Sequence, residues 1–106
     1  MSNLVPFTML SAVTVLDSSL PDWKLLDGPS DGPRTQRYEV VFERPFTNAP
    51  LVHVGITGLD ASKDDNLRLR VRAVDIASHG FVIEAETWLN TRIWAVDVTW
   101  LAIGTV

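Results

Sequence analysis

The chain carries few of the side chains that enzymes use for catalysis. It has two histidines, His53 and His79, and no cysteine, so thiol nucleophiles, disulfide frameworks and zinc–thiolate or iron–sulfur sites are excluded. Neither histidine is accompanied by a serine and an orienting carboxylate at a recognisable spacing. His53 lies in an apolar stretch, and we interpret it as a core or interface residue. We therefore expect no enzymatic activity.

One short segment resembles the start of a metal-binding loop. The sequence Asp60-x-Ser62-x-Asp64 has the spacing with which a calcium loop begins. Such a loop needs glycine at its sixth position and a bidentate glutamate at its twelfth, where this chain has Asp65 and Val71. We interpret the segment as a solvated turn, and we expect neither a metal ion nor another cofactor.

Residue types that are common in binding sites are better represented in this chain than catalytic or metal-binding ones. The chain has four tryptophans, of which Trp88 and Trp94 bracket a short turn, whereas Trp23 and Trp100 are interpreted as core residues. Rigid aromatic faces beside an arginine and loop aspartates can stack on a pyranose ring and hydrogen-bond its hydroxyls. Hot spots of protein interfaces use the same residue types. The residues therefore predict a binding site and leave a sugar and a protein open as its ligand.

These side chains must be positioned by β-strands, because no stretch of ten residues has a convincing helical period. Apolar and polar residues alternate over 34–43 and over 66–77, as in half-buried strands. Residues 50–59 form a more continuous apolar run, which is typical of a central or interface strand. Strands are also predicted at 81–88 and 92–105. The spacing predicts an all-β domain of five or six antiparallel strands and favours a β-sandwich over a closed barrel.

Two other segments complete the predicted single domain of residues 1–106. Residues 17–33 are rich in proline, glycine and aspartate, which predicts a long irregular loop of the kind that often carries function. Another strand is predicted near 12–16, preceded by an apolar, uncharged arm at 1–11. No lysine or arginine precedes this apolar region and Pro6 interrupts it, so no signal peptide is predicted.

The predicted hairpin brings an arginine close to a tryptophan. With a turn near Ser78-His79, Arg72 lies across from Glu84 or Glu86, and Arg70 lies across from Glu86 or Trp88. Pairing with glutamates explains these two arginines without any function. Arg68 then lies near Trp88 without an acidic partner. We expect this pair to belong to the binding site.

Charge and hydropathy exclude several partners. With 46% hydrophobic and 21% charged residues the chain is an ordinary folded protein, and its net charge of −4 gives no field that attracts nucleic acid. No stretch approaches the roughly 20 apolar residues of a membrane span. We expect a soluble protein with no nucleic-acid partner and no membrane insertion. The compartment stays open, a secreted or virion-associated location included.

A series of short motifs runs in a fixed order through the chain. The motifs are RPFxxAPxV at 44–52, ITGLD at 56–60, NLR at 66–68, HGF at 79–81, TWLNTRIW at 87–94 and VTWLAIG at 98–104. Together they resemble the H-type lectin domain family, which is found in snail agglutinins and slime-mould discoidins. The resemblance extends from about residue 23 to residue 104.

The resemblance implies a six-stranded antiparallel β-sandwich that assembles as a homo-trimer or as a hexamer of two trimers. It also implies sugar sites in the clefts between subunits, a preference for galactose or N-acetylgalactosamine, and no metal. Matched residue by residue, the sugar-binding arginine of the family corresponds to Arg68 and the tryptophan before the hairpin turn to Trp88. The sugar-binding loop aspartate is best matched by Asp31.

Two positions depart from the family pattern. Leu89 stands where the family usually has histidine and cannot hydrogen-bond a hydroxyl, whereas Trp94 replaces a tyrosine and keeps a stacking face. We expect both tryptophans to stack on the sugar, Arg68 and Asp31 to hold its hydroxyls, and Leu89 to form an apolar wall. Because a lost hydrogen bond costs about 0.5–1.5 kcal/mol, a changed sugar specificity is expected.

The sequence therefore predicts a multivalent glycan-binding lectin of the kind used in cell adhesion. Residues 50–59, with His53, are predicted to lie at the trimer axis. The alternative is a module that keeps the lectin fold without a sugar and serves oligomerisation or attachment in a larger phage or secreted bacterial assembly. The apolar arm at 1–11 and the change to Leu89 favour that alternative.

Overall fold

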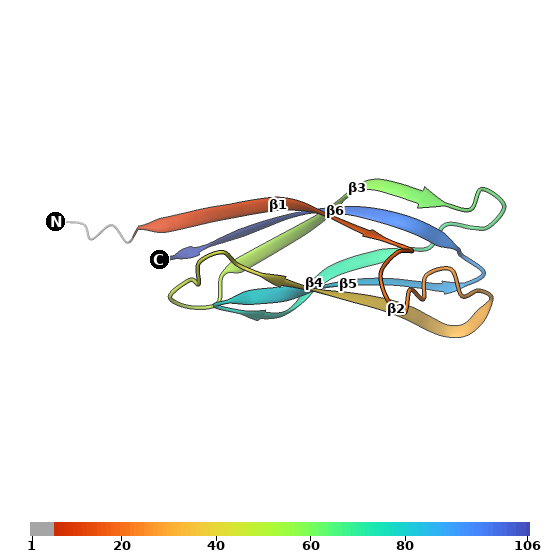
Figure 1. Cartoon of the computed structure of the whole chain (residues 1–106), viewed down its shortest axis with the longest axis horizontal. Coiled ribbons are helices and arrows are strands. Elements are labelled where there is room, and N and C mark those ends of the chain that lie inside the picture. The colour runs from red at the N-terminus through yellow and green to blue at the C-terminus, as the bar shows by residue number, and fades with distance from the viewer. Residues whose placement is uncertain (1–5) are drawn as a thin grey trace.

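The computed structural model describes residues 6–106, which form six antiparallel β-strands (Figure 1). The strands are β1 (Phe7–Asp17), β2 (Ser30–Val41), β3 (Leu51–Ala61), β4 (Arg70–Ala77), β5 (Gly80–Leu89) and β6 (Ile93–Thr105). One sheet has the order β1-β6-β3 and the other the order β2-β5-β4. The predicted all-β sandwich of six antiparallel strands is confirmed. Within residues 6–106, no helix is long and apolar enough to cross a membrane.

The core lies between the two sheets because each strand turns alternate residues inward. In β6 the inward positions run through Val96, Val98, Trp100 and Ala102, all buried. The Trp100 ring packs edge-on against Phe81 with 5.4 Å between centroids. Such a pair contributes about 0.5–1.5 kcal/mol beyond the area that it buries. Trp100 is therefore a core residue, as predicted.

Strand β1 begins earlier than the sequence predicts. It pairs with β6 from Phe7, opposite Thr105, to Asp17, opposite Ala95, so the predicted arm is wrong over residues 7–11. The physical reason is that β6 is a long central strand whose backbone groups on this side need partners, and β1 supplies them along its whole length. The outward face of β1 is itself apolar, which masks the alternation in the sequence. Residues 1–5 of the predicted arm lie outside the described residues.

In the hairpin of β4 and β5, Arg70 lies opposite Glu86 and Arg72 opposite Glu84, which is one of the two registers that the sequence left open. The strand begins only at Arg70, so the strand predicted from residue 66 is wrong over 66–69. In residues 66–69 hydrogen bonds from side-chain hydroxyls replace the backbone hydrogen bonds of a paired strand. For example, Thr87 Oγ1 donates to the carbonyl of Arg68. The segment that precedes β4 is therefore a loop held by side chains.

The two ends of the sandwich are built from different segments. The start of β1, the end of β6 and the connection 42–50 meet at one end, where the C-terminus lies (Figure 1). The connections 18–29, 62–69 and 90–92 meet at the other end. We call these the terminal end and the loop end. The three connections of the loop end surround the candidate site.

Candidate functional site

A hollow of about 450 Å³ opens at the loop end, where the start of β2, the loop before β4 and the end of β5 meet. It is lined by Pro29, Ser30, Asp31, Arg68, Leu89 and Asn90. Three of the five residues predicted for the site, Asp31, Arg68 and Leu89, are thus brought together. The lining combines a carboxylate, a guanidinium and an amide with an exposed aliphatic side chain.

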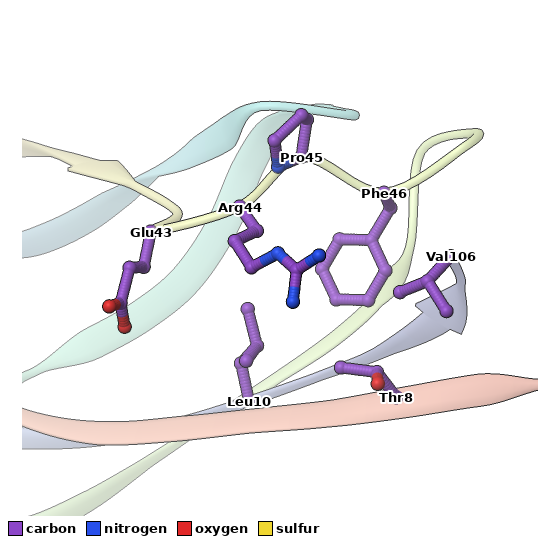
Figure 2. A pocket seen from close by; sticks show the side chains of 7 residues that line it. All are labelled: Thr8, Leu10, Glu43, Arg44, Pro45, Phe46 and Val106. Atoms are coloured by element: carbon purple, nitrogen blue, oxygen red, sulfur yellow. The ribbon is translucent and has the colours of Figure 1, made fainter.

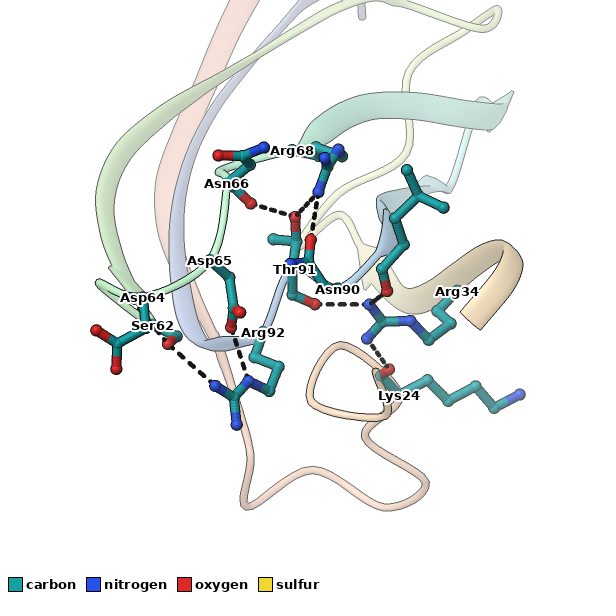
Figure 3. Close-up of polar contacts among 11 residues, drawn as sticks. Lys24, Arg34, Ser62, Asp64, Asp65, Asn66, Arg68, Asn90, Thr91 and Arg92 are labelled. Atoms are coloured by element: carbon teal, nitrogen blue, oxygen red, sulfur yellow. Dashed lines mark hydrogen bonds and ion pairs between the residues drawn. The ribbon is translucent and has the colours of Figure 1, made fainter. Parts of the chain in front are cut away.

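Arg68 is held in place by neutral oxygen atoms (Figure 3). Its Nη1 donates to Asn90 Oδ1 at 2.7 Å and to Thr91 Oγ1 at 3.2 Å. The hydroxyl of Thr91 in turn donates to the carbonyl of Asn66. No ion pair to Arg68 occurs within residues 6–106, and its Nε and Nη2 donate to no group of that part of the chain. Three N–H donors of an oriented guanidinium therefore remain for a ligand.

The two predicted tryptophans do not line this hollow. In β5 the side chains before Trp88 alternate between buried and half-buried, which directs Trp88 to the outer face of the β2-β5-β4 sheet. There the guanidinium carbon of Arg70, rather than that of Arg68, lies 5.2 Å from the centre of the Trp88 ring. Trp94 belongs to the other sheet, at an irregularity in the pairing of β6 with β3, and is 40% exposed. Within one chain the two rings therefore lie on different sheets.

Arg34 organises the site, and sequence reasoning did not identify it. It is only 7% exposed, and its Nη2 donates to the carbonyls of Leu89 at 3.0 Å and Thr91 at 2.6 Å. Its Nη1 donates to the carbonyl of Lys24 at 3.1 Å and its Nε to Ser30 Oγ at 2.9 Å. One buried guanidinium thus ties the 18–29 connection and the start of β2 to the turn after β5 (Figure 3).

Burial lowers the pKa of Arg34, and the nearby charge of Asp27 opposes that effect. An arginine keeps its charge under such a shift because its ordinary pKa is so high. The sequence did carry a signal for this residue, since Arg34 lies an even number of residues from the buried Val40 of the same strand and therefore faces inward with it. A charged residue at an inward strand position marks a buried polar cluster.

Leu89 has an unusual backbone conformation at the edge of the hollow. Its φ is 56°, and the other non-glycine residues with positive φ in the described chain are Asp22 and Asp75. Aspartate tolerates this region, whereas for other L-residues it costs about 1–2 kcal/mol. The hydrogen bond from Arg34 to the carbonyl of Leu89 helps to hold the conformation. The Leu89 side chain remains 47% exposed.

A second arginine braces the loop before β4 from its other side. Arg92 Nε donates to Asp65 Oδ2 at 2.7 Å, and this contact holds the pKa of Asp65 below its ordinary value (Figure 3). Ser62 also accepts a hydrogen bond from Arg92. The calcium-like segment of the sequence is therefore part of a turn. In the described part of the chain, no three His, Asp or Glu side chains are placed to hold a metal ion.

Comparison with known proteins identifies the family. Residues 37–103 match the model of the H-type lectin domain. The chain belongs to the H-type lectin domain family. The matched range includes Arg68, Trp88, Leu89 and Trp94, whereas the loop that carries Asp31 precedes it.

A curated relative is the protein named ATP synthase subunits region ORF 7 from Fuscovulum blasticum. It is 43% identical over 76 residues, which cover 72% of this chain and 66% of the relative. Its name describes a genomic location rather than an activity.

Solved structures show the same fold. Wild-type discoidin II from Dictyostelium discoideum has a TM-score of 0.80 at 22% identity over 95% of this chain. The tailspike protein gp49 from Pseudomonas phage LKA1 has a TM-score of 0.62 at 16% identity over 96% of this chain. The chain spans only 38% of the discoidin and 15% of the tailspike. The H-type lectin fold of this protein is thus a recurring module of longer chains.

Proposed function

We propose that this protein is a non-enzymatic lectin that binds carbohydrate in the hollow at its loop end. The observation that carries the proposal is the convergence of Asp31, Arg68 and Leu89 on one hollow in a chain of the H-type lectin domain family. The three unpaired N–H donors of Arg68 supply hydrogen bonds to sugar oxygens, and the carboxylate of Asp31 accepts them from hydroxyls. Leu89 supplies an apolar wall for the C–H groups of the ring.

The proposed ligands are glycans that end in galactose or N-acetylgalactosamine, or in a related sugar. The family resemblance supports the first two, and the change to Leu89 favours an altered preference. Because the leucine side chain cannot donate or accept a hydrogen bond, it favours binding of apolar groups of the sugar over binding of hydroxyls.

We further propose that the protein acts as a homo-trimer or as a hexamer of two trimers. The outer face of the β1-β6-β3 sheet supports this, since several large apolar side chains are exposed along its β1 edge and at the start of β3. On β1, Phe7, Met9, Val13 and Val15 are more than half exposed, and Leu51 on β3 flanks the half-buried Ile103 of β6. A monomer rarely leaves such a face uncovered.

Oligomerisation would also give the two tryptophans a role. Neither ring lines the hollow of its own chain, so stacking on the sugar requires Trp88 or Trp94 from a neighbouring subunit. Several weak sites on one rigid assembly then bind a glycan-covered surface with high avidity.

A second candidate function is attachment without sugar recognition. The likeness in fold to a phage tailspike supports it, because that protein embeds the same fold in a chain of which it makes up a small part. The apolar outer face of β1 would then contact another part of a larger assembly.

A glycan array of the purified protein tests the proposal. We expect selective binding to galactose-type glycans, and we expect Arg68→Gln to weaken it at least tenfold. Arg37→Gln is the matched control, because Arg37 lies on the outer sheet surface and pairs there with Asp75 and Glu84. Trp88→Ala, tested beside them, reports on stacking. Silence from a folded, assembled protein would refute the lectin function and favour the attachment module.

A further inference from the structure

Leu89 is the residue of the hollow whose side chain fits its own backbone least well. With φ at 56° it occupies the left-handed region, where asparagine or glycine is the usual residue. The backbone conformation itself serves the Arg34 cluster, since it presents the carbonyl of Leu89 to Arg34 Nη2. Asparagine would satisfy that requirement with less strain. The backbone conformation at position 89 therefore does not explain why the residue is leucine.

Core packing does not explain the leucine either. Its side chain is 47% exposed and forms part of the lining of the hollow. Around it the lining is mostly polar, with Ser30, Asp31, Arg68 and Asn90. An exposed aliphatic side chain among hydrogen-bonding groups is complementary to a ligand that carries hydroxyls and an apolar group close together.

We propose that Leu89 selects sugars that present a methyl group beside their hydroxyls. This inference rests on the proposed lectin function. Two classes of sugar carry such a methyl group, the 6-deoxyhexoses at C6 and the N-acetylhexosamines on the acetamido group. A methyl group buried against Leu89 leaves water favourably, whereas a hydroxyl at the same place loses its hydration without a partner. Arg68 and Asp31 hold the remaining hydroxyls in either class.

Matched pairs of monosaccharides test the selection by isothermal titration. D-galactose and 6-deoxy-D-galactose differ only at C6, and D-galactose and N-acetyl-D-galactosamine differ only at C2. We expect the methyl-bearing member of one pair to bind about threefold to tenfold more tightly. The pair that shows the preference identifies which methyl group contacts Leu89.

Variants assign the preference to this side chain. Leu89→Met keeps an apolar group and should keep the preference, whereas Leu89→Asn should reduce it to less than twofold. Leu89→Asn should also raise the melting temperature, because asparagine tolerates the left-handed conformation. Leu67→Asn is the matched control, since Leu67 is an exposed leucine in the neighbouring loop that does not line the hollow. It should leave the preference unchanged.

The outcomes separate this inference from the lectin function. Sugar binding without a preference in either pair, or a preference that survives Leu89→Asn, overturns the selection by Leu89 and leaves the lectin function intact. A lower melting temperature in Leu89→Asn overturns it as well, because the leucine then serves stability. A folded protein that binds none of these sugars and no glycan of the array overturns both.

Discussion

The two ends of the sandwich carry hollows of similar size that are built in different ways. At the loop end the hollow of about 450 Å³ is surrounded by side chains that hydrogen-bond one another. At the terminal end a cavity of about 320 Å³ is lined by apolar side chains together with Glu43 and Arg44 (Figure 2). It is lined by Thr8, Leu10, Glu43, Arg44, Pro45, Phe46 and Val106.

The arginines of the two ends show the difference most clearly. Arg34 and Arg68 at the loop end are fixed by carbonyl, hydroxyl and amide oxygens. Arg44 points into the terminal cavity in Figure 2, and within residues 6–106 it makes no ion pair. A binding site needs polar groups whose orientation is set before the ligand arrives. Hollow size therefore does not distinguish the two ends, whereas preorganisation does.

The largest expected effect comes from the packing of the terminal end. Phe46 is buried and packs edge-on against Phe42 with 5.2 Å between ring centroids. Phe46→Ala should lower the free energy of unfolding by about 3–5 kcal/mol, measured by urea denaturation. Sugar affinity of the fraction that remains folded should stay within about twofold of wild type. A tenfold loss of affinity would show that the two ends are coupled.

Arg34→Met should have the next largest effect, and it should affect both stability and binding. The change leaves the carbonyls of Lys24, Leu89 and Thr91 without their donor, which should cost about 2–4 kcal/mol of unfolding free energy. Sugar affinity should fall at least tenfold, because the loops around the hollow lose their common anchor. Arg44→Met is the matched control at the other end and should change unfolding by less than about 0.5 kcal/mol. Equal effects of the two substitutions would contradict the contrast between the ends.

Thr91→Val tests the support of Arg68 without touching the hollow itself. Thr91 is buried, accepts from Arg68 and donates to the carbonyl of Asn66. Valine has nearly the same shape and loses both hydrogen bonds, so we expect a stability loss of about 1–2 kcal/mol. We also expect a threefold to tenfold loss of sugar affinity in titration calorimetry. An unchanged affinity would mean that Asn90 alone orients Arg68.

The smallest effect concerns the brace of Arg92 on Asp65. The pKa of Asp65 is lower in the folded protein than its ordinary value of 3.8, so the contact with Arg92 stabilises the folded state when the pH is above 3.8. This stabilisation is lost as the pH falls through the folded-state pKa. Asp65→Asn should therefore be less stable than wild type near pH 6. The difference should shrink at pH 3 and below, in thermal denaturation at several pH values. A difference that is constant with pH would exclude the ion pair as its cause.

Local sequence patterns predicted the elements of the sandwich well and their exact extent less well. Alternation placed β5 within one residue at either end, and the turn at Ser78-His79 restricted the partner of Arg70 to Glu86 or Trp88, of which the structure has Glu86. The same patterns failed at Phe7, where both faces of β1 carry apolar residues, and at Arg68, where hydroxyls of other segments replace the ladder. Alternation of polar and apolar residues identifies a strand only when one face is exposed to water and the other is buried. It therefore does not identify a strand with apolar residues on both faces.

The candidate site was predicted in part. Arg68 was predicted from the hairpin pattern and from the family resemblance, and Leu89 and Asp31 from the resemblance alone. The three residues meet in one hollow although they come from segments far apart in the chain. The expected grouping with Trp88 and Trp94 does not occur within one chain, because strand parity and an irregularity in β6 direct the rings to different sheets. Arg34 was missed although it occupies an inward position of its strand, because most of its partners are backbone carbonyls, and no sequence pattern identifies which carbonyls a buried guanidinium will meet.

The amino-acid sequence by itself determined the all-β class and the membership of the H-type lectin domain family, since both depend on residue order along short segments. Only the tertiary structure decided which residues share the hollow, how Arg34 anchors it and why Leu89 is strained at its edge. Those properties arise from contacts between residues up to 57 positions apart, such as the bond from Arg34 to the carbonyl of Thr91. Contacts at that separation depend on how two sheets pack, and sheet packing is a property of the whole chain.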